Sequence, residues 1–259
     1  MKTTNKLLLL FVLFNLISAP RLWAQMDEEI RIILQKFASD YETDPSFTSQ
    51  SFGVEVDKDM WSITTSGEKN GRTVQVKKGS PSVPTFYYVT NLETLKLIDA
   101  GKMNAMTAGV KAFSTDYAPL DIEVMEGYQP KEDFVGEVLA FTFHFWTRGI
   151  PEMIPFGPHY TRSSHGAQAA IFYYDKGLRT GYGYIHPGQH ANEHPMSKTN
   201  PFPSMMIVIK GKIVARLDGI EHTVEQGNAF FIPAGMSHEV LNPFDEAGEI
   251  ILLMFGEGA

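Results

Sequence analysis

The 259-residue sequence contains no cysteine. This absence excludes disulfide bonds, cysteine nucleophiles, thiolate zinc sites and acylation of a lipoprotein cysteine. Any metal would therefore be held by nitrogen and oxygen ligands. The chain also lacks an excess of basic residues, since its formal net charge is −8. An acidic chain of this kind has no basic face for phosphates, so we expect no nucleic-acid partner.

Long hydrophobic runs are also scarce, because only the N-terminus carries one. Two lysines precede an apolar run from Leu7 to Ala19, and Leu22-Trp23-Ala24 matches the small-residue pattern of a cleavage site. We therefore predict a signal peptide over residues 1–25, cleaved after residue 24, and an exported protein that is periplasmic or secreted. An uncleaved membrane anchor is the alternative, but Pro20 and Arg21 interrupt the run before it reaches a comfortable spanning length.

Two common catalytic motifs are missing as well. The sequence has neither the glycine-rich loop that cradles phosphates nor the serine nucleophile elbow. Its hydrophobic fraction of 43% and charged fraction of 20% are those of a globular protein. A chain of this length accommodates one large domain or two ordinary ones.

The part of the chain that follows the signal peptide predicts a mixture of helices and strands. Apolar residues recur at helical spacing in one segment, alternate in others, and are separated by capping and turn residues. The expected elements are a helix over Asp27–Asp40, a hairpin over Phe52–Thr64, strands over Thr73–Val76 and Thr85–Val89, a helix capped by Asn91 and running through Ile98, and a short helix over Asn104–Ala112.

Residues 26–125 resemble the sterol-carrier-protein lipid-binding domain. The resemblance is carried by Trp61-Ser-Ile-Thr and by the segment from Thr94 to Ala108, which includes Ile98-Asp-Ala-Gly101. It implies an α+β domain that encloses an apolar tunnel for a lipid-like molecule. Ordinary core packing is the alternative for such apolar positions, and the pattern alone favours it. The lining residues implied by the resemblance are Phe86, Leu95, Ile98, Met103 and Met106.

Residues 126–165 are rich in aromatics and prolines, and we interpret them as a connector. Alternating phenylalanines over Phe141–Trp146 predict a strand in which His144 is a core histidine. Arg162, His159 and His165 fall in a predicted loop that could approach the mouth of the following domain.

The remainder of the chain predicts an all-β domain, because short alternating segments follow one another with turn residues between them. About eight strands at this spacing indicate a sandwich or a barrel. The expected strands are Ala169–Tyr174, Gly181–His186, Met205–Ile209, Ile213–Leu217, Glu221–Val224, Ala229–Ile232, His238–Leu241 and Glu249–Phe255.

Residues 166–259 resemble the cupin double-stranded β-helix. The resemblance is carried by the segment from Gly183 to His194 and, more completely, by the segment from Gly227 to Asn242, which contains Pro233, Gly235 and His238. Gly227 and Gly235 permit tight turns, and Pro233 stiffens a strand end. The resemblance places His238 on the following strand with its side chain directed inward.

The first of these segments departs from the family pattern. Metal-binding cupins use a His-x-His pair and a glutamate, whereas this sequence has Asn192-Glu193-His194 and places Ser204 where the glutamate is expected. His190, His194 and His238 are therefore the predicted metal ligands for Fe, Mn, Ni, Cu or Zn, with Glu193 as a further ligand or a catalytic base. A solvent-exposed His190 and a buried, hydrogen-bonded His238 are the alternatives.

Three aromatic residues, Tyr173, Tyr182 and Tyr184, are predicted to line the cavity of the barrel together with these histidines. Simple filling of the barrel interior explains them equally well. The fold expected overall is multi-domain, with an N-terminal α+β region followed by an all-β cupin jelly-roll barrel. Three functions remain open. The first is binding of a small apolar or sugar-like molecule, the second is a metal-dependent dioxygenase, isomerase or lyase, and the third is a structural or partner-binding homodimer.

Overall fold

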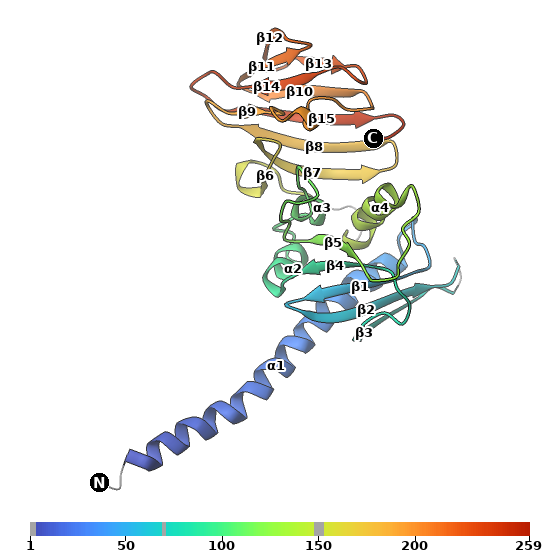
Figure 1. The fold of residues 1–259 in the computed structure, drawn as a ribbon, viewed down its shortest axis with the longest axis vertical. Coiled ribbons are helices and arrows are strands. Elements are labelled where there is room, and N and C mark those ends of the chain that lie inside the picture. The colour runs from blue at the N-terminus through green and yellow to red at the C-terminus, as the bar shows by residue number, and fades with distance from the viewer. Residues whose placement is uncertain (1–3, 69–70, 148–152) are drawn as a thin grey trace.

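The computed structural model describes residues 4–68, 71–147 and 153–259, with side chains described from residue 23 onward within these ranges. A sheet with helices forms one end of the molecule, and an all-β body forms the other (Figure 1). Residues 1–3 and the side chains up to residue 22, on which the signal-peptide prediction depends, lie outside the described part. Within that part, no helix is both long and apolar enough to cross a membrane.

The N-terminal region confirms the hairpin, the two further strands and the capped helices expected from the sequence. Its five strands are ordered β3-β2-β1-β4-β5, with β1 and β4 parallel and the other neighbours antiparallel. The predicted helix over Asp27–Asp40 forms the second half of a longer one. The elements are α1 Thr4–Glu42, β1 Gln50–Val56, β2 Asp59–Ser66, β3 Thr73–Lys78, β4 Phe86–Thr90, α2 Leu92–Asp99, α3 Ala105–Ala108 and β5 Asp121–Val124.

Helix α2 begins where the sequence indicates because the Asn91 side chain accepts a hydrogen bond from the Thr94 backbone N–H. Helix α3 begins in the same way, since Asn104 accepts from the Met106 backbone N–H at 2.8 Å. This second helix ends at Ala108, four residues earlier than predicted. The residues that follow form a loop, and Ala112, Phe113 and Asp116 of this loop line the candidate site.

The predicted strand over Phe141–Trp146 is wrong, because these residues belong to helix α4 (Phe134–Trp146). Its buried residues are spaced at three and four, the period of a helix packed on one side. The alternating phenylalanines imitate a strand only over a few positions. The buried residues are Val138, Phe141, Thr142, Phe145 and Trp146.

Helix α4 completes the N-terminal core instead of connecting two domains. Phe141 and Phe145 contact Phe52 of β1 with ring centroids 5.0 and 4.9 Å apart, and Trp146 contacts Phe37 of α1 at 5.0 Å. His144, the predicted core histidine, is only partly buried, and its Nδ1 lies 3.3 Å from the carboxylate of Asp44. The apolar faces of α1, α4 and the sheet therefore share one core.

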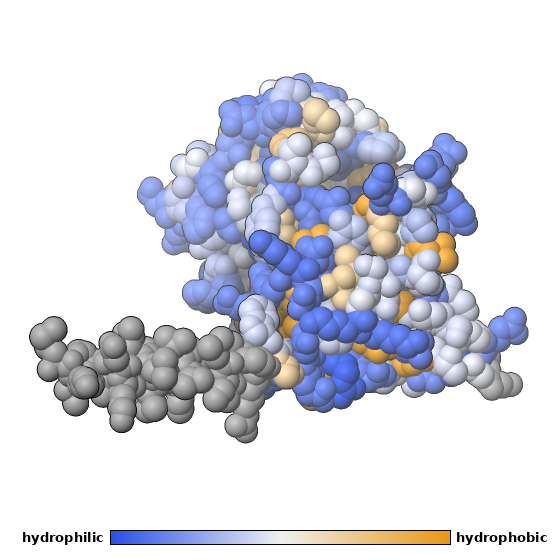
Figure 2. Space-filling model, turned by 60° about the horizontal axis from the view of Figure 1, so that its bottom comes forward, coloured by the Kyte–Doolittle hydropathy of each residue, from blue (hydrophilic) through white to orange (hydrophobic). Residues whose placement is uncertain are grey.

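Four of the five residues implied as lipid-tunnel lining lie in or against this packed core, and the fifth, Met106, is buried outside it. Phe86, Leu95 and Ile98 are buried members of it, Met103 packs against it, and Met106 is 7% exposed. Seen from outside, this end of the molecule carries mainly hydrophilic residues with scattered apolar ones (Figure 2). These positions are accounted for by side-chain packing, and lipid binding stays a prediction from the sequence.

The C-terminal region contains all eight strands expected from the sequence, together with two short ones that were not. They form a six-stranded sheet, β13-β10-β15-β8-β7-β6, and a four-stranded sheet, β12-β11-β14-β9. The elements are η1 Pro158–Tyr160, β6 Arg162–Ser164, β7 Ala167–Asp175, β8 Leu178–Ile185, β9 His190–Ala191, η2 Pro195–Ser197, β10 Ser204–Lys210, β11 Lys212–Leu217, β12 Ile220–Glu225, β13 Ala229–Ile232, β14 His238–Leu241 and β15 Gly248–Phe255.

Alternation decides which side chains the two sheets enclose. Met206 and Val208 of β10 face inward with Ile250 of β15, and they meet Ile213 and Val240 of the smaller sheet in one apolar core. The turns of the Gly227–Asn242 segment form as expected, since Gly227 and Gly235 have φ values of +85° and +78°.

The N-terminal and C-terminal regions are joined by hydrogen bonds in which one partner is a backbone group and the other is a side chain. Arg162 of β6 donates from Nη1 to the carbonyl oxygens of Ala108 at 2.9 Å and Val110 at 2.6 Å, and from Nη2 to that of Tyr117 at 2.9 Å. The Ile171 backbone N–H of β7 donates to the Thr107 hydroxyl at 2.8 Å. The loop after α3 is thereby held against the barrel.

Candidate functional site

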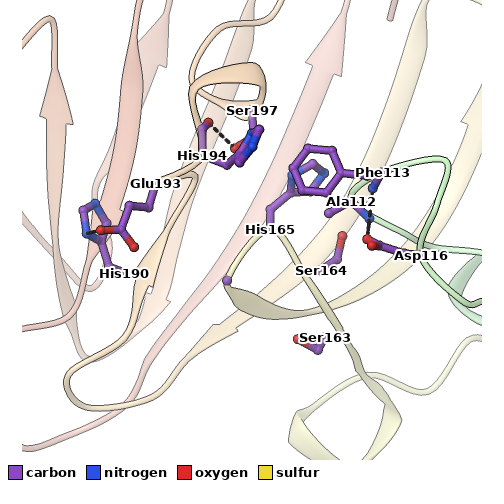
Figure 3. A pocket seen from close by; sticks show the side chains of 11 residues that line it. Ala112, Phe113, Asp116, Ser163, Ser164, His165, His190, Glu193, His194 and Ser197 are labelled. Atoms are coloured by element: carbon purple, nitrogen blue, oxygen red, sulfur yellow. Dashed lines mark hydrogen bonds and ion pairs between the residues drawn. The ribbon is translucent and has the colours of Figure 1, made fainter.

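A cavity of about 360 Å³ lies where the loop after α3 meets the barrel. Three segments that are distant in sequence supply its walls, and Figure 3 shows their side chains around the common space. This volume lies near the lower end of the 300–1,000 Å³ that small-molecule sites occupy. The lining residues are Ala112, Phe113, Asp116, Ser163, Ser164, His165, Gly166, His190, Glu193, His194 and Ser197.

The first wall is the turn between β6 and β7. His165 and Gly166 have φ values of +51° and +81°, the left-handed pair that a tight hairpin turn requires. A side chain at Gly166 would meet the His190 carbonyl oxygen at 2.5 Å, so only glycine allows the turn to lie this close to β9. The His165 carbonyl accepts a hydrogen bond from the Asn192 backbone N–H at 2.8 Å. The first and second walls are thus tied together.

The second wall is the segment from His190 to Ser197. His194 caps the short helix η2, because its Nδ1 accepts a hydrogen bond from the Met196 backbone N–H at 3.3 Å. This contact leaves the proton of a neutral imidazole on Nε2. The Ser197 hydroxyl donates to the His194 carbonyl at 2.9 Å, which fixes the same turn from inside the cavity.

The third wall comes from the N-terminal region. The Asp116 carboxylate accepts hydrogen bonds from the backbone N–H groups of Ala112 and Phe113 at 3.1 and 3.0 Å, and this closes the loop on itself. The Phe113 ring lies edge to face with the His194 ring, with centroids 4.6 Å apart, and 6.3 Å from the His165 ring. An aromatic side chain of one region therefore touches imidazoles of the other.

Ser164 lies at the inner side of the cavity and is only 6% exposed. Within the described part of the chain its hydroxyl has no hydrogen-bond partner. In Figure 3 this hydroxyl points toward the space between His165 and Asp116. A buried hydroxyl without a partner carries a desolvation cost of about 1–3 kcal/mol, which a bound polar group would remove.

The three predicted metal ligands do not all share one site, because His190 and His194 line the cavity whereas His238 does not. In the smaller sheet His190 is the cross-strand partner of Leu241, and Ala191 is the partner of Val240. Directly opposed residues share a face, so His190 lies on the outer face, whereas His238, two residues from the inward-facing Val240, lies inside. No group of three or more His, Asp or Glu side chains in the described ranges is arranged to hold a metal ion. The donor set does not fit the metal that the cupin resemblance implies.

His238 and its neighbour Glu239 have opposite surroundings. His238 is 3% exposed, its Nδ1 lies 3.2 Å from the Met236 carbonyl, and burial lowers its pKa. Glu239 faces outward, where its carboxylate accepts from Lys198 at 3.0 Å and lies 2.6 Å from His190 Nε2. These hydrogen bonds, the one from Lys198 first, lower the pKa of the Glu239 carboxyl group. His190 is thus engaged outside the barrel.

The predicted catalytic residue Glu193 lies at the rim of the cavity. Its side chain is 75% exposed, and its carboxylate is 3.8 Å from His190 Nδ1 (Figure 3). A carboxylate this exposed has solvent as its main partner. Its catalytic role stays a prediction.

The three predicted cavity tyrosines do not line this pocket. Tyr182 and Tyr184 of β8 alternate with the inward-facing Ile185, so they lie on the outer face of the larger sheet. Tyr182 donates to the Glu249 carboxylate at 2.7 Å, and Tyr173 packs on the Phe143 ring of α4 at 4.7 Å. The tyrosines cover the barrel from outside.

Sequence reasoning missed Phe113, Asp116 and Ser164. It placed His165 in a loop able to approach the barrel mouth, and the structure confirms this position. Arg162, from the same predicted loop, binds backbone carbonyls instead. The Asp116 spacing to Ala112 and Phe113 was a readable turn signal, but nothing in the sequence related that turn to the barrel.

Two antiparallel sheets closed around one apolar core place the C-terminal region among the jelly-roll barrels. Residues 182–254 match the family described as the cupin domain. The C-terminal barrel of this chain is therefore a cupin domain, as the sequence motifs predicted. The comparison with curated proteins finds no match.

Several solved structures are similar to the barrel. A cupin 2 conserved barrel domain protein from Salinispora arenicola CNS-205 is 19% identical, with 40% of this chain and 88% of that chain covered and a TM-score of 0.36. An RmlC-like cupin from Shewanella frigidimarina NCIMB 400 is 19% identical, with 40% and 90% covered and a TM-score of 0.34. A predicted oxalate decarboxylase from Thermotoga maritima is 17% identical, with 34% and 79% covered and a TM-score of 0.31. None of these likenesses bears on activity.

Proposed function

We propose that this chain is a small-molecule-binding protein whose ligand occupies the cavity between the loop after α3 and the cupin barrel. The observation that carries the proposal is the Ser164 hydroxyl, which is buried, faces the cavity and has no partner among the described residues. Around it the cavity offers an aromatic ring, imidazoles and carboxylates on elements that hydrogen bonds hold in place. Binding is favoured over catalysis because Glu193, the predicted base, lies exposed at the rim.

A variant that fills the cavity tests this proposal. Ala112 lines the cavity from the loop side, so an Ala112→Trp indole would occupy the ligand space. Ala234 is exposed in the turn after β13 and is not among the lining residues, so Ala234→Trp is the matched control. Saturation-transfer NMR against a panel of neutral, acidic and basic metabolites should show binding to the unmodified protein and to the control, and loss of it in Ala112→Trp. Equal binding by both variants, or no binding by any protein, would overturn the proposal.

The metal-dependent enzyme predicted from the sequence is the alternative function. Metal analysis of the protein as purified tests it, with His194→Ala and His238→Ala as the informative variants. A first-row metal at one equivalent that is lost in both variants would favour the enzyme. Export, lipid binding by the N-terminal region and a homodimer also stay predictions from the sequence.

A further inference from the structure

The charge of the cavity lining limits which molecules it accepts. Asp116 and Glu193 contribute carboxylates, and none of the described lining residues is a lysine or an arginine. The three cations that directly neighbour lining residues along the chain are already engaged, because Lys111 donates to Asp121, Lys198 donates to Glu239 and Arg162 donates to backbone carbonyls. A carboxylate or phosphate ligand would therefore meet negative charge without a cation to balance it.

The hydrogen-bonding groups of the cavity are mixed. The Ser164 hydroxyl can donate or accept, and Asp116 accepts. Burial lowers the pKa of His165, so the neutral form of its ring is favoured, and this form has one hydrogen-bond donor and one acceptor. His194 uses Nδ1 to cap η2, which leaves Nε2–H as a donor. An ammonium group only donates and a carboxylate only accepts, whereas hydroxyl groups match both kinds of partner.

The Phe113 ring adds the apolar part of the lining. It stands next to the imidazole of His194 at the boundary of the two regions. A flat aromatic surface beside polar groups suits a molecule with C–H groups on one face and hydroxyl groups on its edges. The volume of about 360 Å³ accommodates a compound of this kind with solvent.

We propose that the cavity binds a neutral polyhydroxylated molecule and discriminates against acidic ones. This inference rests on the proposed function, because it concerns the same cavity. The Ser164 hydroxyl is its central contact, since it alone of the lining hydroxyls is both buried and without a partner in the described ranges. Through the loop residues Phe113 and Asp116, the N-terminal region contributes one wall of the binding site.

The test uses neutral monosaccharides and disaccharides as probes, each monosaccharide accompanied by its uronate and its 2-amino counterpart. Dissociation constants are measured by NMR from the imidazole signals of His165 and His194. At least one neutral sugar should bind about tenfold more tightly than its uronate and no more weakly than its amino counterpart. Tighter binding of a uronate or an amino sugar than of every neutral probe would overturn the inference, as would absence of binding by all neutral probes.

Ser164→Ala provides the matched structural test, with Ser204→Ala as its control. Ser204 is 1% exposed, its hydroxyl also lacks a partner among the described residues, and it faces the barrel core instead of the cavity. Removing an unpaired buried hydroxyl leaves folding intact in both variants. Affinity for the neutral sugar should fall about three- to tenfold in Ser164→Ala, the effect of one hydrogen bond, and stay unchanged in Ser204→Ala. Equal affinities in the two variants would remove Ser164 from the site and overturn the inference.

The two proposals fail separately. If Ala112→Trp abolishes binding of an acidic or basic metabolite while neutral sugars do not bind, the cavity is a binding site and only the ligand class is wrong. If Ala112→Trp leaves all binding unchanged, the cavity itself is not the site, and both proposals fall.

Discussion

Single residues on strand β14 show how position on a sheet sets the state of a side chain. His238 faces the barrel interior, where burial disfavours the imidazolium form and lowers the pKa of the ring. Glu239, the next residue, faces outward, where Lys198 and His190 stabilise its charged form. Adjacent residues of one strand thus favour a neutral base and a charged acid.

This arrangement predicts a pH-dependent stability. A histidine whose pKa is lowered by folding contributes its full stabilisation above the unfolded pKa of about 6.5, and that contribution is lost as the pH falls from there through the lowered folded pKa. The melting temperature of the protein should therefore decrease as the pH falls from about 8 to 5. Calorimetry across this range measures the effect.

His238→Gln is the variant that isolates this histidine, because glutamine has no group that titrates in the range. The decrease in melting temperature with falling pH should be smaller in the variant than in the unmodified protein. Identical slopes for the two proteins would show that another group governs the acid response.

At the scale of elements, helix α4 determines the N-terminal core. Its aromatic face packs on β1 and α1, and Thr142 places its hydroxyl 2.9 Å from the buried Tyr88 hydroxyl of β4. Burial raises the pKa of Tyr88, so this phenol is held neutral and hydrogen-bonded. The segment interpreted as a connector from the sequence therefore contains a helix that packs on the sheet and belongs to the N-terminal core.

Truncation of one buried α4 residue should show that this helix stabilises the N-terminal core. Phe145 is fully buried and touches Phe52 and Tyr41, so Phe145→Ala should lower the free energy of unfolding by about 3–5 kcal/mol. Val135 lies on the same helix and is 64% exposed, so Val135→Ala should change it by less than about 0.5 kcal/mol. Urea unfolding measures both values. Similar small effects for the two variants would mean that α4 does not pack as described.

At the scale of the whole molecule, the cavity exists only because the two regions are held together. Arg162 is the main polar link, since its guanidinium donates to carbonyl oxygens of the loop that carries Phe113 and Asp116. Partial burial lowers the pKa of Arg162, which remains charged at any ordinary pH. Its hydrogen bonds position the loop, and the Arg162 side chain itself is not among the residues that line the cavity.

Arg162→Gln should loosen this loop. Hydrogen bonds from a charged donor contribute about 1.5–3 kcal/mol each, and the variant leaves several carbonyls without their donor. Hydrogen exchange over residues 107–117 should become at least about tenfold faster, while exchange in the barrel strands stays unchanged. Lys176→Gln is the control, because Lys176 also links the regions, through exposed ion pairs with Asp133 and Glu137, and such pairs contribute little. Equal exchange in both variants would contradict a positioning role for Arg162.

The parts of the fold that were predictable depend on local rules. The eight barrel strands follow from alternation, the turns at Gly227 and Gly235 from the left-handed backbone that glycine tolerates, and the starts of α2 and α3 from asparagine caps. The sequence of α4 fits both the two-residue repeat of a strand and the spacing of a helix, so it was assigned wrongly. Only packing against α1 and the sheet decides between the two. The candidate site was predictable only at His165, His190, Glu193 and His194, which the motif and its neighbourhood supply.

The sequence by itself determined the secondary structure of the barrel, the cupin resemblance and the absence of thiol chemistry, because these depend on composition and on residues close along the chain. Only the tertiary structure decided what the site contains. Strand register placed His190 outside the barrel and His238 inside it, and the docking of the loop brought Phe113 and Asp116 to Ser164. Register and docking are set by burial and hydrogen bonds between distant segments, and spacing along the chain does not encode these directly.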